Sequence, residues 1–130
     1  MARAAGLCDP HRVELDPKQV ARRLEARARE VKATREQEAA RIADLVRREA
    51  AAALVPGARA WLIGSLAWGG FGPHSDIDVV VEGLSSDRIT TLEARLSEST
   101  GRPIEILVLS ELSAPFRGRV RDEGIVLHAS

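Results

Sequence analysis

The sequence changes character at Pro56-Gly57, and this change is the strongest constraint on the fold. Residues 18–55 are dominated by Ala, Arg, Glu, Leu and Gln and lack both glycine and proline, which favours helix. After the change, short apolar runs are separated by glycines, a pattern typical of strands and tight connections. We therefore expect a helical N-terminal region followed by an α/β core.

The helical region has a well-marked beginning. In Asp16-Pro17-Lys18-Gln19, an N-cap carboxylate precedes a proline at the first helical position, and Gln19 can close a capping box. We predict two helices, residues 17–33 and 35–54, with one long helix as the alternative.

The two predicted helices differ in their apolar faces. Val20, Leu24 and Val31 form only a thin seam in the first, which indicates either a solvated helix or a coiled-coil or partner-binding element. The second has a wider apolar stripe that predicts packing against a core. Its members are Ile42, Leu45, Val46 and Leu54.

Four short apolar runs after residue 57 predict a sheet. The runs are 58–63, 77–81, 104–109 and 125–127, the last as an edge strand. A helix opening at Ser86 and ending at Gly101 separates the second run from the third, and Ser110 is a predicted cap for a short helix ending near Gly124. The predicted fold class is α/β (α+β), with a small mixed sheet of about three to five strands flanked by helices.

Charge and cysteine content exclude several functional classes. Nineteen basic residues balance nineteen acidic ones, so no overall positive charge is available to coat a polyanion. Residues 51–130 are net acidic, which argues against a template-dependent polymerase. A single cysteine, Cys8, cannot form an internal disulfide, and no apolar run approaches the roughly 20 residues of a membrane span. We predict a cytoplasmic protein that does not bind membranes.

Three acidic residues fall on predicted buried strands, where an unpaired carboxylate is unfavourable. Asp76 and Asp78 project from one face of their strand because side chains alternate, while Ile77 and Val79 turn toward the core. If the strand of Glu105 pairs beside theirs, three carboxylates share one site. Such an all-oxygen set suits Mg²⁺ or Mn²⁺ rather than zinc.

A glycine-rich connection precedes these carboxylates. Gly64 lets the chain approach a bulky anion, and Ser65 offers a hydroxyl and an amide at a helix N-terminus, where phosphate binds favourably. A phosphate-binding turn beside a carboxylate metal site is what nucleotidyl transfer requires, with in-line attack on an α-phosphate.

Gly64-Ser65, followed after ten residues by Asp76-Ile77-Asp78 on a strand, resembles the signature of the DNA polymerase β-like nucleotidyltransferases, specifically their minimal, MntA-like branch. The resemblance covers about residues 35–130 and includes the stretch Arg117 to Gly124. It implies a minimal nucleotidyltransferase domain of the polymerase β-like type in residues 35–130, with residues 1–34 as an N-terminal helical extension.

The resemblance also implies site residues, cofactors and a partner. It implies that Gly64 and Ser65 bind the nucleotide phosphates and that Asp76, Asp78 and Glu105 serve catalysis and hold Mg²⁺ or Mn²⁺. We predict Trp68 and Ser75 as further nucleotide-binding residues. Members of this kind are often antitoxins that transfer AMP from ATP to a tyrosine of a HEPN-domain (HepT-like) ribonuclease toxin. The sequence contains no tyrosine, so the acceptor must be another molecule.

Two positions depart from the family pattern. Relatives frequently have Arg where this sequence has Trp68, which is expected to stack on adenine, face the partner, or simply pack. Glu105 replaces the commoner Asp, and an edge strand can also point a Glu to solvent.

Two other functions remain open from the sequence. One is a catalytically weak antitoxin that binds the toxin through its N-terminal helix, and the other is nucleotidyl transfer to a small molecule. Both homo- and hetero-oligomers are compatible with the sequence.

Overall fold

The computed structural model describes residues 16–128. Contacts within the chain divide it into two units, residues 1–34 and 35–130. Helix α2 (Pro17–Ala53) begins in the first unit and ends in the second. None of the helices in the described residues has the length and apolar character needed to cross a membrane.

Helix α2 begins where the sequence predicts and continues further than expected. The Lys18 N–H donates to Asp16 Oδ1 at 3.1 Å, which confirms the N-terminal cap. The predicted break near residue 34 is wrong, and the single long helix is correct. Thr34 is the weakest helix former at that point, but one Thr costs only about 0.7 kcal/mol or less, and no glycine or proline is present to end the helix.

The sheet has four strands, which confirms the predicted fold class. They are β1 (Arg59–Ile63), β2 (Ile77–Glu82), β3 (Ile104–Val108) and β4 (Ile125–Leu127), arranged in the order β3-β2-β1-β4. β1 pairs antiparallel with both β2 and β4. β2 and β3 are parallel because α4 (Ser86–Thr100) crosses between them.

Among the remaining helices, α4 and α5 (Ala114–Glu123) have side-chain N-caps. Gly101 ends α4 in the left-handed conformation, as predicted, with a φ of 67°. The predicted cap at Ser110 is wrong, because Ser110 lies inside the 3₁₀ helix η1 (Leu109–Glu111). Ser113 caps α5 instead and accepts a hydrogen bond from the Phe116 N–H at 3.4 Å. Pro115 favours this later start, since proline suits the first helical turn.

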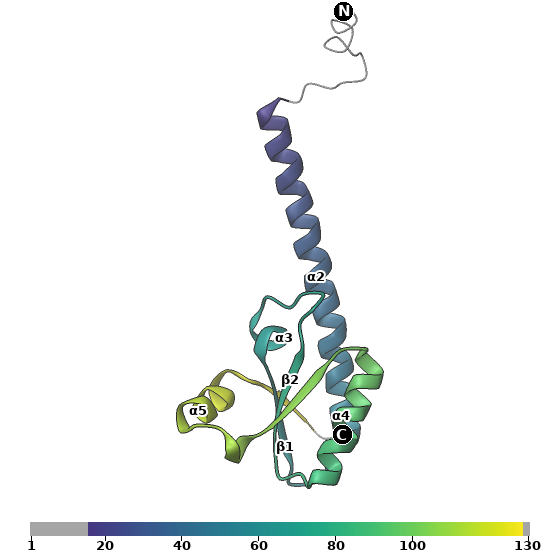
Figure 1. Cartoon of the computed structure of the whole chain (residues 1–130), viewed down its shortest axis with the longest axis vertical. Helices are drawn as coiled ribbons and strands as arrows, with labels where there is room; N and C mark the ends of the chain where they lie inside the picture. Colours follow the sequence, from purple (N-terminus) through teal and green to yellow (C-terminus); the bar gives the residue numbers. More distant parts are fainter. Residues whose placement is uncertain (1–15, 129–130) are drawn as a thin grey trace, which may run out of the picture. The chain divides into compact units, whose positions relative to one another are not determined.

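Different helices cover the two faces of the sheet, with α4 on one side of it and α5 on the other (Figure 1). Alternate strand residues, including Leu62, Ile77 and Val79, pack against residues 42–50 of α2 and against α4. The intervening residues form a smaller cluster with α5 and η1. Its buried members are Trp61, Ile63, Val80, Leu109 and Val120. We call these the α2/α4 face and the α5 face.

Candidate functional site

The candidate site lies at the end of the α5 face where β2 begins. In the register, Asp78 is opposite Ile63 of β1 and Glu105 of β3. Directly opposite residues on neighbouring strands project to the same face, so the two carboxylates share the face on which Ile63 packs. Strand pairing therefore brings together two acids that are distant in the sequence.

Gly64 approaches this pair from the end of β1. Its φ is +73°, and a Cβ added there would lie 2.5 Å from Asp78 Oδ2. Glycine is required for both reasons, because a side chain would be strained and would meet the carboxylate. Helix α3 (Gly64–Trp68) begins at this point, and no side chain caps its first turn. The Gly64-Ser65 turn thus stands directly against the carboxylate of Asp78.

The surroundings of Asp78 are electrostatically unfavourable for a negative charge. Burial raises the pKa of Asp78, and Glu105 raises that pKa further through its charge and a hydrogen bond, with a smaller effect from the charge of Asp76. The charges of both other predicted acids therefore act on Asp78. A carboxylate whose pKa is raised by burial and by neighbouring carboxylates marks a candidate functional site.

The exposure of these acids differs from the expectation. Asp76 precedes β2 rather than lying on it, and both Asp76 and Glu105 are exposed, while Asp78 is half-buried. The prediction that all three lie on buried strands is wrong, because β3 is an edge strand and the site lies at the end of the sheet.

Within residues 16–128, no three His, Cys, Asp or Glu side chains are grouped as a metal site. The charges of Asp76 and Glu105 nevertheless both act on Asp78. The donor chemistry itself fits Mg²⁺, since all the ligand atoms would be carboxylate oxygens. A metal role for these residues remains a proposal.

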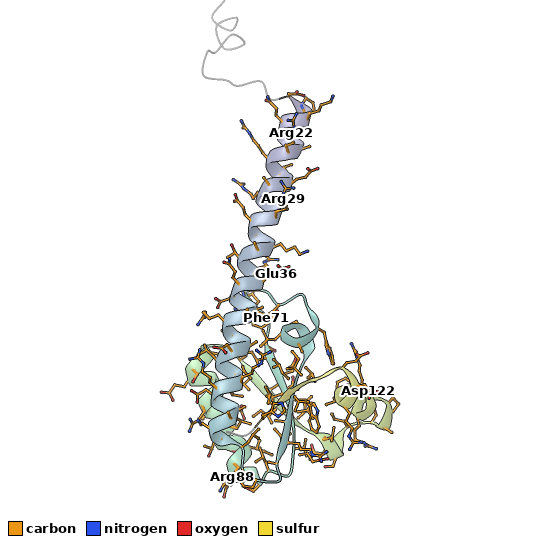
Figure 2. All side chains as sticks on the ribbon, turned by 180° about the vertical axis from the view of Figure 1, so that it is seen from behind. Arg22, Arg29, Glu36, Phe71, Arg88 and Asp122 are labelled. Carbon is orange, nitrogen blue, oxygen red and sulfur yellow. The ribbon has the colours of Figure 1, made fainter. Side chains whose placement is uncertain are left out.

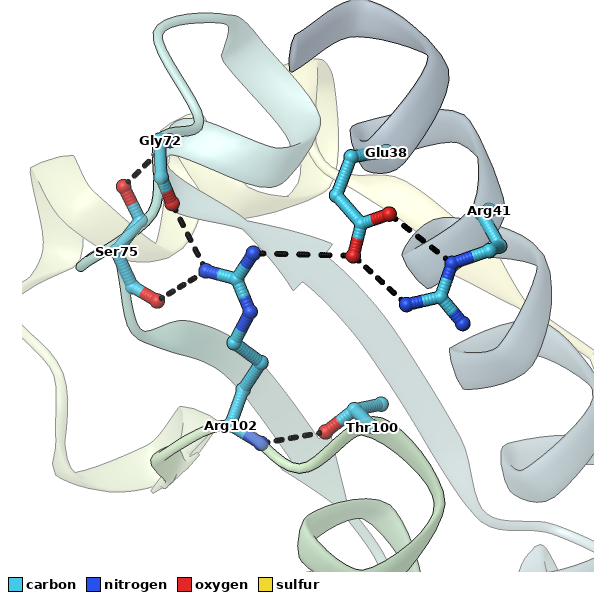
Figure 3. Close-up of polar contacts among 6 residues, drawn as sticks. All are labelled: Glu38, Arg41, Gly72, Ser75, Thr100 and Arg102. Carbon is cyan, nitrogen blue, oxygen red and sulfur yellow. Dashed lines mark hydrogen bonds and ion pairs between the residues drawn. The ribbon is translucent and has the colours of Figure 1, made fainter. Parts of the chain in front are cut away.

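The loop between α3 and β2 is held by Arg102, a residue that the sequence analysis missed (Figure 3). The Arg102 guanidinium donates to the carbonyl oxygens of Gly72 at 2.8 Å and Ser75 at 3.4 Å, and it lies 4.5 Å from the centre of the Phe71 ring. Its side chain is only 15% exposed. Arg102 therefore fixes the segment that leads into Asp76.

Two further contacts complete this loop anchor (Figure 3). The Arg102 Nη2 atom lies 3.9 Å from Glu38 Oε1 on α2. The Gly72 N–H donates to Ser75 Oγ at 2.9 Å. The Ser75 hydroxyl, predicted to bind nucleotide, is thus engaged as an acceptor within the loop, and its proton is available to another group.

Comparison with known families identifies this arrangement. A family model described as "Polymerase beta, Nucleotidyltransferase" matches residues 58–130, which include both the Gly64-Ser65 turn and all three acids. The chain belongs to this nucleotidyltransferase family. Among curated proteins, none matches the sequence.

Solved structures that resemble this chain share less than a quarter of its residues. A toxin–antitoxin structure with AMP-PNP shares 22% identity over 73% of each chain, with a TM-score of 0.49. A structure of the toxin–antitoxin MntA-HepT shares 19% identity over 72% of each chain, with a TM-score of 0.43.

Trp68, the last residue of α3, packs against α5. Its indole N–H donates to the Glu123 carbonyl oxygen at 2.9 Å, and the Arg119 guanidinium carbon lies 4.0 Å from the ring centre. The ring also contacts the apolar cluster of the α5 face. These contacts support the packing interpretation of Trp68, and they supply a physical reason for an aromatic residue at this position.

A separate hollow lies away from the candidate site. A cavity of about 490 Å³ is lined by residues that include Arg59 and Val126. Arg59 is opposite Glu82, at the other end of the β1–β2 pair from Asp78. We identify the candidate site by its carboxylates and by Gly64 and not by this hollow, because an open nucleotide site at a sheet end need not form a deep cavity.

Proposed function

We propose that the chain is a Mg²⁺-dependent nucleotidyltransferase that transfers AMP from ATP to a hydroxyl of a partner protein. The partner would be a HEPN-domain (HepT-like) ribonuclease toxin, and modification of a tyrosine in it would make this chain its antitoxin. Residues 35–130 would form the nucleotidyltransferase domain, with residues 1–34 as an extension. The family membership of the chain supports the reaction class.

The observation that carries this proposal is the approach of Gly64 to Asp78. A Cβ at Gly64 would lie 2.5 Å from Asp78 Oδ2, so the chain leaves no room for a side chain between the turn and the carboxylate. A phosphate held at the Gly64-Ser65 turn would therefore lie next to the carboxylates that are to hold its counter-ion. A turn with a purely structural role would not need this close approach.

The proposed roles follow from the chemistry of these groups. Gly64 and Ser65 would bind the phosphates, and Asp76, Asp78 and Glu105 would hold Mg²⁺. When bound, Mg²⁺ would neutralise phosphate charge and make the attacking hydroxyl more acidic. The hydroxyl oxygen would form a bond to the α-phosphorus, the bond from that phosphorus to pyrophosphate would break, and the hydroxyl proton would pass to a carboxylate.

A labelling experiment tests this proposal. The chain, a purified HepT-like protein and ATP labelled at the α-phosphate are incubated with Mg²⁺, and label on the second protein is measured. We expect transfer by the wild type and at least about a hundredfold loss in Asp76→Asn/Asp78→Asn, since removing metal ligands removes several kcal/mol of transition-state stabilisation. Asp122→Asn, an exposed carboxylate on α5, is the control and should retain transfer.

Absence of transfer by folded wild-type protein would contradict the enzymatic proposal. The second candidate is then a catalytically weak antitoxin that neutralises the toxin by binding alone. The exposed apolar side chains of Leu24 and Val31 on the N-terminal part of α2 favour this candidate. Under it, neutralisation survives the double Asn variant. Labelling of a small molecule in place of the protein would instead indicate the third function that the sequence left open.

A further inference from the structure

Residues 17–34 of α2 form a helical segment with an exposed apolar seam. Leu24 is 60% exposed and Val31 is 44% exposed, and both are among the few large apolar side chains that are exposed in the described residues. The buried residues of α2 begin only at Ile42. Helices in proteins gain most of their stability by packing an apolar face, so the exposed seam of this segment is a candidate surface for a partner.

The seam has a defined position on the helix. Val20 and Leu24 are four residues apart and Leu24 and Val31 are seven apart, so all three lie along one side. Arg27 lies three residues after Leu24 and four before Val31, and Arg23 precedes Arg27 by four. Two arginines therefore border the apolar seam, and we call this surface, formed by these five residues, the basic seam.

The charge of the segment selects the kind of partner. Residues 17–34 contain six basic and two acidic side chains, a net charge of +4. A second copy of the same segment would bring two such charges together and place Arg27 at the contact, which disfavours self-association. An acidic helix with its own apolar stripe would instead cover the seam and pair with the bordering arginines.

Other binding partners fit the segment less well. RNA would use the arginines but would leave Leu24 and Val31 without an apolar surface to cover them. An anionic membrane would repel Glu25 and Glu30, and the seam contains no aromatic residue to enter the headgroup layer. Arg22 and Arg29, labelled in Figure 2, are seven residues apart and so share a side of the helix. Arg22 is two residues from both Val20 and Leu24, a spacing that places it on the opposite side from the seam.

We infer that the basic seam docks an acidic, apolar-faced helix of a partner protein. The inference rests on residues outside the carboxylate site and does not depend on the proposed nucleotidyl transfer. It predicts that binding depends on the apolar residues of the seam and on Arg23 and Arg27, and not on the arginines elsewhere on the helix.

The test uses the full chain and a designed probe. The probe is a fluorescent helical peptide with Leu at the a and d positions of its heptads and Glu at the flanking positions, and binding is followed by anisotropy. Leu24→Ala/Val31→Ala removes the seam while keeping a good helix former at both positions, so lost binding cannot be assigned to lost helix. We expect at least tenfold weaker binding by this variant, checked beside its circular dichroism.

A matched pair of charge variants tests the side of the helix. Arg23→Glu/Arg27→Glu alters the border of the seam, whereas Arg22→Glu/Arg29→Glu makes the same change of net charge away from it. We expect at least tenfold weaker binding for the first pair and less than threefold for the second. Equal losses would show general charge attraction and overturn the inference, as would retained binding in Leu24→Ala/Val31→Ala.

Three further arms use the other candidate partners. In two of them, single-stranded RNA of 20 nucleotides or phosphatidylserine vesicles replace the peptide. In the third, sedimentation of the chain alone measures its self-association. Binding to any of them that is tighter than to the acidic peptide and that is lost in Leu24→Ala/Val31→Ala would overturn the assignment to an acidic protein helix. Weaker or seam-independent binding to all three supports it.

Discussion

The two faces of the sheet differ in the side chains that they carry. The α2/α4 face is filled along its whole length by apolar side chains, and Leu62, Ile77 and Val79 are fully buried there. The α5 face has a smaller apolar cluster and ends in Asp78 and Glu105. The comparison teaches that stability comes mainly from one face, which leaves the end of the other free to hold charged groups that do not favour folding.

The largest effect on stability is expected on the α2/α4 face. Leu62→Ala should lower the free energy of unfolding by about 2–5 kcal/mol, because it removes a fully buried side chain and leaves a cavity. Urea denaturation measures the loss. Val126→Ala on β4 is the control, since Val126 is 48% exposed and should change stability by about 0.5 kcal/mol or less. Similar losses in the two variants would contradict the division between the faces.

A glycine pair separates backbone strain from effects on the site. Gly57 and Gly64 both have positive φ, but only at Gly64 would a Cβ meet Asp78. Gly57→Ala and Gly64→Ala should each lower the free energy of unfolding by about 1–2 kcal/mol. The Asp78 carboxylate can rotate away from the added methyl group, so Gly64→Ala should also lower nucleotidyl transfer at least tenfold.

The labelling assay with folded protein measures this second effect. Gly57→Ala is the matched control and should keep its transfer activity, because nothing lies within 4 Å of its added Cβ. If both variants lose transfer equally, the close approach of Gly64 to Asp78 has no part in the reaction.

The smallest effect is the pH dependence due to Asp78. Its pKa is raised in the folded protein, so between the ordinary Asp pKa and the raised value the folded state binds more protons than the unfolded state. This contribution to stability is complete below the ordinary pKa and is lost as the pH rises through the raised value. Asp78→Asn has no carboxyl group to titrate and so does not lose stability in this way. The free energy of unfolding of this variant relative to the wild type should therefore increase with pH.

Urea denaturation from about pH 3 to pH 8, with a chelator present, measures this dependence. Asp122→Asn serves as the control for removal of an exposed carboxylate. A difference between Asp78→Asn and the wild type that stays constant over the range would show that burial and Glu105 do not perturb Asp78.

Much of the fold follows from local patterns. The strands and α4 were predicted within a residue or two, because alternating apolar residues and a capping glycine act over a few neighbours. The start of α5 was misplaced, since Ser110 and Ser113 are both good caps and Pro115 decides between them. The predicted break in α2 is wrong because its two parts differ in apolar pattern but share high helix propensity.

The candidate site was only partly within reach of the sequence. The motif of Gly64, Asp76 and Asp78 is local, and it was found. The anchoring by Arg102 was missed, because its partners Gly72 and Ser75 lie 30 and 27 residues away, and a single Arg between a glycine and a proline gives no signal. The contacts of Trp68 with Glu123 and Arg119 of α5 were also missed, because these residues lie 55 and 51 positions further along, and a nucleotide contact of Trp68 stays a prediction.

The sequence by itself determined which residues turn inward on each strand, where the glycine turn lies and that the acids at 76 and 78 stand together, because these depend on periodicity and on spacing within one segment. Only the tertiary structure decided that Glu105 lies opposite Asp78 and that the backbone of Gly64 lies close to the same carboxylate. The reason is that strand order and register are set by which distant segments bury one another, a choice made by the whole core and not by the residues that meet at the site.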